Sequence, residues 1–278
     1  MATELPYHAQ LPFTFGALEQ DAGSFERARA VVLPVPFERT TSYVPGTKNG
    51  PREIIAASGQ VELYDEELGR EICDVGIHTL PAMESPFAST DDAFAEMRRV
   101  AGWLAGAGKF FVALGGEHAL TAPLVAGVAA VHPGVTVLQI DAHADLRESY
   151  MGDRHSHASA MRRVLEYAPT VQVGIRNLSA PEADAIPGLE TTVFYDWNMR
   201  NDPEWITRVV EALGEIVDQA PAERIFLAKP LVAAALASAS EFVRVQALRA
   251  MRTIGTPSDV DAVLDVLLPD MMGYHLAE

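Results

Sequence analysis

The feature that most constrains this fold is a regular alternation of short apolar runs with longer amphipathic segments, which begins near residue 30. The runs are rich in β-branched residues, and the segments between them have helical periodicity. Nearly continuous apolar strands, each followed by a helix, are typical of a mainly parallel sheet covered on both faces. Strands are predicted at 30–35, 110–114, 135–140, 171–175, 192–195 and 224–227, and helices at about 91–106, 119–130, 157–168 and 203–218.

The alternation stops near residue 229, which divides the chain into two predicted parts. Residues 1–228 are expected to form an α/β domain with its chemistry in the loops beyond the carboxyl ends of the strands. Residues 229–278 are predicted to be mostly helical, and EFVRVQALRAMRTIG is similar to the second helix of a HEAT-type repeat. Since one such repeat cannot bury its own apolar face, this short all-helical segment is a candidate surface for protein contacts.

Composition excludes several classes of function. The formal net charge of −17 would repel a phosphate backbone, so a nucleic-acid partner is not expected, whereas a small cationic substrate fits that charge. Cys73 is the single cysteine, which rules out an internal disulfide and fits a reducing compartment. No apolar stretch of about 18 residues occurs, so neither export nor membrane insertion is predicted, and a cytoplasmic location is expected.

Acidic and imidazole side chains follow the predicted strand 135–140, in the run DAHAD. In extended backbone, residues two apart project from the same face, so Asp141 and His143, with Asp145 next in the series, can converge beyond the strand end. Two carboxylates and an imidazole suit Mn²⁺ or another divalent ion. The alternative interpretation is that these residues simply begin a solvated loop.

An upstream strand end reads Gly115-Gly116-Glu117-His118. Paired glycines permit a sharp turn and a close backbone approach, which would bring His118 to the same rim of the sheet as Asp141. By itself, a histidine after two glycines is more often a turn residue. Its place one strand before the aspartate motif favours a metal ligand instead.

Two histidines open the predicted helix 157–168, in the run RHSHAS. A histidine at a helix start near a metal-bound water could carry protons, because its ordinary pKa lies near neutrality. The alternative makes Ser156 or Ser159 a helix cap and leaves both histidines exposed. For His155 that alternative is preferred.

Together these motifs resemble a known family. GGEH, DAHAD about two dozen residues later, SHASAMRR and VGIRNLS look like the motifs of ureohydrolases of the arginase and agmatinase family, and most like the bacterial agmatinase branch. The stretch PFERTTSYVPGTKNGPREIIAASGQVELYDEEL is also similar to that branch. The resemblance covers about residues 30–227 and implies a three-layer α/β/α fold of the arginase and deacetylase type. A deacetylase-like metal hydrolase also uses Asp-x-His near a metal, but SHASAMRR and VGIRNLS favour the ureohydrolase.

The resemblance implies a binuclear manganese site. In that family two Mn²⁺ ions share a bridging hydroxide that attacks a guanidinium carbon and releases urea and an amine. The implied substrate is agmatine, the amine is putrescine in polyamine metabolism, and the assembly is a homo-oligomer. His118, Asp141 and Asp145 would bind one ion, Asp141 and His143 the other, and His157 would carry protons.

The sequence departs from the family pattern after residue 227. The family carries a second motif there, Ser-x-Asp-x-Asp-x-x-Asp-Pro, whose first two aspartates complete both coordination shells, but this chain reads Ala-Lys-Pro at 228–230. The family's later substrate-binding glutamate also has no counterpart in a matching context. Asp259 and Asp261 have similar spacing, but they follow Gly-Thr-Pro rather than a strand, which favours a helix start. A catalytically impaired pseudoenzyme or fusion remnant is therefore the alternative to an active enzyme.

Overall fold

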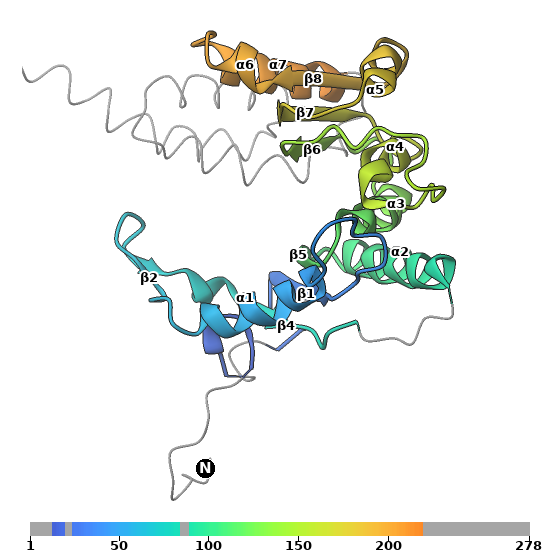
Figure 1. Cartoon of the computed structure of the whole chain (residues 1–278). Coiled ribbons are helices and arrows are strands. Elements are labelled where there is room, and N and C mark those ends of the chain that lie inside the picture. Colours follow the sequence, from blue (N-terminus) through green and yellow to red (C-terminus); the bar gives the residue numbers. More distant parts are fainter. Residues whose placement is uncertain (1–12, 20–23, 84–88, 219–278) are drawn as a thin grey trace, which may run out of the picture. The chain divides into compact units, whose positions relative to one another are not determined.

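The computed structural model describes residues 13–19, 24–83 and 89–218 (Figure 1). The predicted strand 224–227, the helical segment 229–278, and Asp259 and Asp261 all lie outside these ranges. Among the described helices, none has the length and apolar character needed to cross a membrane. The described residues form two compact units: the first holds those up to Val131 together with Asp145–Val164, and the second holds His132–Ala144 and those from Leu165 onward.

The first unit is built on a parallel three-stranded sheet in the order β4-β1-β5. The predicted strand 30–35 is confirmed as β1 (Ala30–Val35), and the strand predicted at 110–114 is β5 (Phe110–Gly115). The sequence patterns missed β4 (Ile77–Thr79) because three residues are too few to show a period. They also missed α1 (Gly50–Ser58), which contacts β1 and β5.

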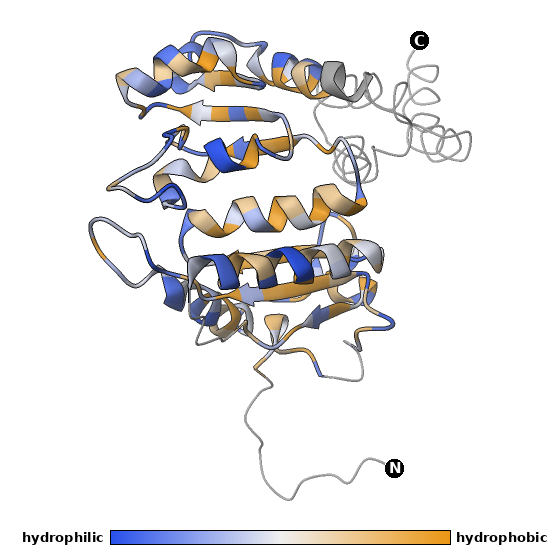
Figure 2. Ribbon diagram, turned by 90° about the vertical axis from the view of Figure 1, so that its right-hand side faces the viewer, coloured by the Kyte–Doolittle hydropathy of each residue, from blue (hydrophilic) through white to orange (hydrophobic). Residues whose placement is uncertain are grey.

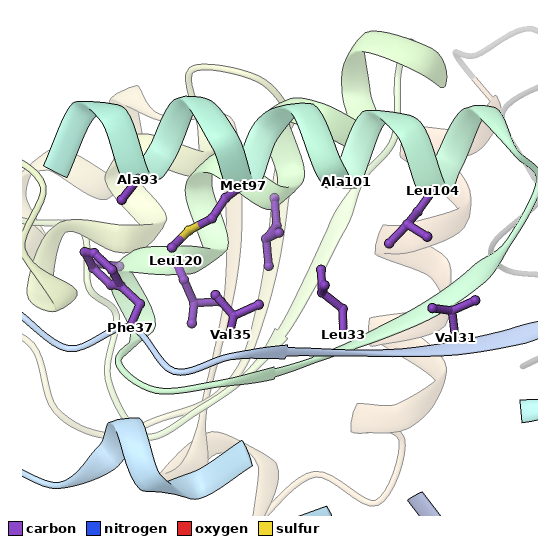
Figure 3. Packing of buried hydrophobic residues seen from close by; sticks show 11 residues of the cluster. Val31, Leu33, Val35, Phe37, Ala93, Met97, Ala101, Leu104 and Leu120 are labelled. Atoms are coloured by element: carbon purple, nitrogen blue, oxygen red, sulfur yellow. The ribbon is translucent and has the colours of Figure 1, made fainter. Parts of the chain in front are cut away.

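The core of the first unit lies between β1 and α2 (Thr90–Gly106). Alternate side chains of β1 point to the helix, and apolar side chains at helical spacing on α2 pack against them (Figure 3). Each fully buried aliphatic side chain contributes about 1.5–3 kcal/mol. The residues labelled in this cluster are Val31, Leu33, Val35, Phe37, Ala93, Met97, Ala101, Leu104 and Leu120.

The helix α3 (Thr121–Val131) packs closely against α2. It is preceded by η4 (His118–Leu120), so the helix predicted at 119–130 is confirmed. A Cβ atom at Gly127 would lie 2.3 Å from the Arg98 carbonyl oxygen, so only glycine permits this approach. In the hydropathy colouring of Figure 2, α3 is mostly apolar whereas α2 alternates between polar and apolar residues, as expected for an inner and an outer helix.

The second unit contains a parallel sheet in the order β6-β7-β8. Its strands confirm three of the predicted ones, with the first shorter by two residues: β6 (Val137–Ile140), β7 (Thr170–Ile175) and β8 (Thr191–Tyr195). The helix α7 (Trp205–Asp218) packs on this sheet, where Val171, Val173 and Val209 are buried together. Parallel sheets with flanking helices confirm the α/β class.

Two predicted helices have different ends in the structure. The helix predicted at 157–168 consists of η5 (His157–Ser159) and α4 (Ala160–Val164), and residues 165–167 form a turn before Pro169. The helix predicted from 203 begins at Trp205, after the Asp202 carboxylate accepts a hydrogen bond from the Glu204 N–H at 3.0 Å. The remaining elements are η1 (Phe15–Ala17), η2 (Thr47–Asn49), the antiparallel pair β2 (Tyr64–Asp65) and β3 (Arg70–Glu71), η3 (Ile72–Val75), α5 (Ala180–Ala185), η6 (Ile186–Gly188) and α6 (Asp196–Met199).

Candidate metal centre

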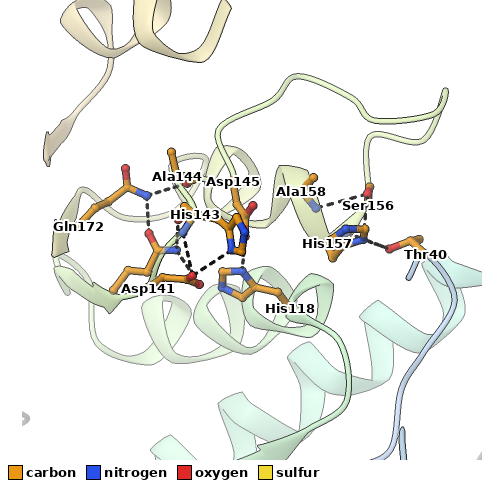
Figure 4. Close-up of polar contacts among 11 residues, drawn as sticks. Thr40, His118, Asp141, His143, Ala144, Asp145, Ser156, His157, Ala158 and Gln172 are labelled. Carbon is orange, nitrogen blue, oxygen red and sulfur yellow. Dashed lines mark hydrogen bonds and ion pairs between the residues drawn. The ribbon is translucent and has the colours of Figure 1, made fainter. Parts of the chain in front are cut away.

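The first unit brings together one predicted pair of ligands, His118 and Asp145. His118 Nδ1 lies 2.7 Å from Asp145 Oδ2, and both side chains are largely buried (Figure 4). Two ligand atoms that bind one ion at about 2.1 Å are separated by about 3 Å when they are neighbours in its shell. An imidazole nitrogen and a carboxylate oxygen at this separation therefore fit a divalent cation such as Mn²⁺.

The turn that carries His118 depends on Gly116. A Cβ atom there would lie 2.0 Å from the Phe37 carbonyl oxygen, and the Gly116 N–H donates to Val35 at 3.2 Å. The backbone of the loop after β1 is thus in direct contact with the turn after β5. The close approach predicted from the paired glycines is confirmed.

Asp145 has a strained backbone. Its φ of 50° lies in the left-handed region that non-glycine residues rarely adopt. Its carbonyl oxygen accepts the N–H groups of Met161 and Arg162, at 3.0 and 3.1 Å, near the start of α4. The first N–H groups of a helix find no acceptor within that helix. Here they donate to Asp145 instead, and these bonds stabilise the strained turn. Backbone strain of this kind is concentrated at functional sites.

The second unit brings together the other predicted pair, Asp141 and His143. Asp141 Oδ1 accepts the His143 N–H at 2.9 Å and lies 3.4 Å from His143 Nδ1. Asp141 still belongs to the edge of the sheet, because its N–H donates to Val173 at 3.0 Å, and His143 forms a parallel bridge with Asn177. The convergence of these two side chains beyond β6 follows the prediction from their spacing.

Two buried glutamines hold the loop after β6, and the sequence reasoning missed both. Gln139 Nε2 donates to the His143 carbonyl at 3.1 Å and to Asp141 Oδ2 at 3.3 Å. Gln172 Nε2 donates to the Ala144 carbonyl at 2.8 Å and also to Gln139 Oε1 (Figure 4). A signal was present in the sequence, since each glutamine interrupts an otherwise apolar strand.

His157, the predicted proton carrier, is anchored in the first unit by Thr40. The Thr40 hydroxyl lies 3.1 Å from His157 Nδ1 and also contacts the carboxylate of Glu117, the residue before His118. Neither Thr40 nor Glu117 was singled out from the sequence. The motif PFERTTS and the motif GGEH were both noticed, but their contact joins residues far apart in the chain.

Ser156 follows the alternative interpretation given to it, whereas His155 is half-buried rather than exposed. His155 lies 3.6 Å from an Asp91 carboxylate oxygen and packs edge-on against Phe94. Ser156 caps η5, because its hydroxyl accepts the Ala158 N–H at 3.3 Å.

A second cluster of metal-binding residue types, Glu71, Cys73 and Asp74, has unsuitable chemistry. Burial raises the pKa of the Cys73 thiol, and the charges of Glu71 and Asp74 raise it further. A thiol must lose its proton to bind a metal, so this cluster is a poor site.

Comparison with known proteins places the chain in a family. A model of the Arginase family matches residues 28–227. The chain is 40% identical over 217 residues to the N(1)-aminopropylagmatine ureohydrolase of Synechocystis sp., covering 74% of this chain and 71% of that protein. It is 36% identical over 200 residues to the protein of the same name from Thermus thermophilus, covering 72% and 68%.

Solved structures give the same result. The proclavaminate amidino hydrolase from Streptomyces clavuligerus matches with a TM-score of 0.61 and 25% identity, over 77% of this chain and 72% of that one. The agmatine ureohydrolase of Thermoplasma volcanium shares the fold, with a TM-score of 0.60 at 20% identity over 84% of this chain and 94% of that one. Sequence and structure agree that this chain belongs to the arginase family of ureohydrolases.

Proposed function

We propose that this chain is a metal-dependent ureohydrolase that cleaves a cationic guanidino compound to urea and an amine. The observation that carries the proposal is the pairing of His118 with Asp145 at 2.7 Å, in a chain of the arginase family. This imidazole and this carboxylate come from loops distant in sequence, and together they offer two donor atoms that one cation could bind.

The proposed metal ligands are His118, Asp141, His143 and Asp145. All but His118 lie on one short stretch of chain, so the backbone between Asp141 and Asp145 limits how far apart their carboxylates can be. The set of oxygen and imidazole donors suits Mn²⁺. When bound, the metal lowers the pKa of coordinated water and so supplies a nucleophile at neutral pH.

The proposed substrate is agmatine or its aminopropyl derivative. The sequence motifs favour agmatine, with putrescine as the amine product, whereas the two relatives from Synechocystis and Thermus are named for N(1)-aminopropylagmatine. Both compounds carry the guanidinium group that the reaction requires, and both are cations that suit a chain with a net charge of −17. A cytoplasmic location and a homo-oligomeric assembly stay predictions.

His157 is proposed to carry protons between the nucleophile and the leaving amine. An amine is a poor leaving group until it is protonated, so cleavage of the guanidinium carbon–nitrogen bond requires a general acid. The histidine is held from one side of its ring by Thr40, at 3.1 Å from Nδ1, which leaves Nε2 for the reaction.

One observation favours a second candidate, a catalytically impaired member of the family. The family match ends at residue 227, where the chain reads Ala-Lys-Pro instead of continuing into the second aspartate motif. Without those carboxylates each ion would lack a ligand. In this case metal binding would be weak or limited to one ion, urea release would be absent, and the segment 229–278 would serve protein contacts.

The test is a urea assay on the manganese-loaded full chain with agmatine and with N(1)-aminopropylagmatine, together with metal analysis of the same sample. We expect urea from at least one substrate and its loss in His118→Asn. His155→Asn is the matched control and should retain turnover, because His155 pairs with Asp91 outside the site. A folded, metal-loaded chain that releases no urea from either compound would reject the enzyme and favour the impaired form.

A further inference from the structure

The Thr40 hydroxyl has a partner at each of its hydrogen-bonding positions. Its oxygen lies 2.8 Å from Glu117 Oε1. It also lies 2.9 Å from the His157 backbone nitrogen and 3.1 Å from His157 Nδ1 (Figure 4). A hydroxyl group has one proton to donate and two lone pairs that accept. Because the three partners use the one proton and both lone pairs, the direction of each hydrogen bond can be deduced.

The direction of the first bond follows from Glu117. Its carboxylate is buried, with only 3% of the residue exposed, and Oε2 already accepts the N–H groups of Arg39 and Thr40, at 2.8 and 2.7 Å. With both backbone N–H groups on Oε2, Oε1 is the carboxylate oxygen that faces the Thr40 hydroxyl. The single proton of the Thr40 hydroxyl is therefore donated to Glu117 Oε1.

The directions of the other two bonds then follow. The backbone N–H of His157 can only donate, so it occupies one lone pair of the Thr40 oxygen. The second lone pair faces His157 Nδ1. Because the hydroxyl has no proton left, this contact is a hydrogen bond only if Nδ1 carries the proton.

We propose that Glu117 and Thr40 are positioning residues that fix His157 in the tautomer protonated at Nδ1. Nε2 is then left with its lone pair and is the atom that accepts and returns the proton. In a neutral histidine, the hydrogen bond made by one ring nitrogen decides which of the two nitrogens carries the proton. The role given to Nε2 rests on the proposed function, whereas the tautomer itself does not.

Among the residues that the structure describes, Ser156 and Tyr150 also contact the ring of His157. The Ser156 hydroxyl lies 3.4 Å from Nδ1, and the ring of Tyr150 meets the imidazole edge-on with centroids 5.8 Å apart. Ser156 is the competing partner, because its hydroxyl could donate to Nδ1 and impose the opposite tautomer. Its longer distance, compared with 3.1 Å for Thr40, favours Thr40 as the determining contact.

The test is nitrogen NMR of the imidazole rings in the full chain labelled with ¹⁵N-histidine, recorded without paramagnetic metal and above the usual pKa of histidine. The His157 signals are assigned by their loss in His157→Gln. Wild type should show a protonated Nδ1 and an unprotonated Nε2. A wild-type spectrum with the proton on Nε2 would overturn the proposal.

Glu117→Gln gives the sharpest variant. The glutamine oxygen must replace Oε2 to accept the two backbone N–H groups, so its amide N–H₂ faces Thr40 and donates to it. The Thr40 proton is then released toward His157 Nδ1, and the tautomer reverses. A spectrum unchanged by Glu117→Gln in a folded protein would contradict the proposed proton arrangement.

Thr40 provides a matched pair of variants. Thr40→Ser keeps the hydroxyl and should keep the wild-type tautomer, whereas Thr40→Val keeps the shape and should lose the preference for Nδ1. Thr47→Val is the control, because it removes a threonine–glutamate bond of 2.8 Å, to Glu38, in the same loop but away from His157. That variant should leave the spectrum of His157 unchanged.

Turnover supplies a second readout. Loss of a correctly placed proton carrier lowers kcat by about 10²–10⁴-fold, so Thr40→Val and Glu117→Gln should lower kcat with little change in KM, and Thr40→Ser should restore it. A chain that releases no urea but shows the Nδ1 proton would reject only the proposed function. An active chain in which Glu117→Gln leaves kcat and the tautomer unchanged would reject this inference alone.

Discussion

The two candidate ligand pairs are held in place in different ways. In the first unit, His118 and Asp145 meet through contacts between segments distant in the chain, including the turn at Gly116 and the start of α4. In the second unit, Asp141 and His143 are held by glutamines of their own and the adjacent strand. A ligand pair can therefore be built from tertiary contacts or from one sheet edge, and only the second kind leaves a compact motif in the sequence.

The largest expected effect is at Asp145, where the first pair can be broken. Asp145→Asn removes the carboxylate that His118 contacts and leaves a poorer metal ligand. We expect kcat/KM for urea release to fall by about 10³-fold or more, which corresponds to about 4 kcal/mol of lost transition-state stabilisation.

The matched control is Asp184→Asn on α5, an exposed aspartate outside both pairs. It makes the same chemical change and should leave kcat/KM within a factor of two or so of wild type, as surface substitutions generally do. Equal losses in the two variants would mean that the effect comes from charge or folding rather than from the site.

The second pair can be broken indirectly, through Gln172. Gln172→Leu removes the amide that donates to the Ala144 carbonyl and to Gln139, so the loop carrying Asp141 and His143 loses its support. Loss of a residue that orients metal ligands typically costs 10–100-fold in metal affinity or activity, and we expect about that loss in manganese affinity. Isothermal titration with Mn²⁺ would measure it.

Thr170→Val serves as the control for Gln172. Thr170 is also buried on β7, but it bonds to Thr191 at 2.7 Å rather than to the loop. Its substitution should cost stability without a comparable loss of metal affinity. If both variants weakened manganese binding equally, the effect would come from disturbing β7 as a whole and not from the contact of Gln172 with the loop.

A smaller effect is expected at the turn of the first unit. In Gly116→Ala the new methyl group would meet the Phe37 carbonyl oxygen at 2.0 Å, so the backbone must shift. Overpacking of this kind costs about 1–3 kcal/mol of unfolding free energy, measurable by denaturant titration. Gly106→Ala, where nothing lies within 4 Å, should not destabilise the protein, and a matching loss there would refute the steric argument.

The smallest expected effect depends on pH. Burial alone would raise the pKa of Glu148, but Arg163, at 3.0 Å, and Arg162 lower it below its usual value overall. A carboxylate with a lowered folded-state pKa stabilises the protein above its unfolded-state pKa, and that stabilisation is lost as the pH falls through the folded-state pKa. Glu148→Gln should therefore cost about 0.2–1 kcal/mol at neutral pH.

Denaturant titrations at neutral and at acidic pH would check the sign. In acid, the wild-type carboxyl group is protonated and resembles the amide of the variant, so the difference between them should shrink. A difference that stayed constant or grew in acid would contradict the assignment to the ion pairs of Glu148.

The sequence could predict what depends on neighbours in the chain. The strand 30–35 and the run that places Asp141 and His143 after β6 follow from local periodicity. The contacts of Thr40 with Glu117 and His157 span 77 and 117 residues, and no periodic pattern reports such a contact. The helix predicted at 157–168 is shorter in the structure, where it ends at Val164 and a turn follows, because local periodicity does not determine where a helix ends.

The central claim is that each of the two pairs binds metal. The most direct measurement is the manganese content of the full chain after loading and removal of free metal, in wild type and in one variant of each pair, His118→Asn and His143→Asn. We predict that wild type retains manganese and that each variant retains less. Wild type without bound manganese, or undiminished content in either variant, would contradict the claim.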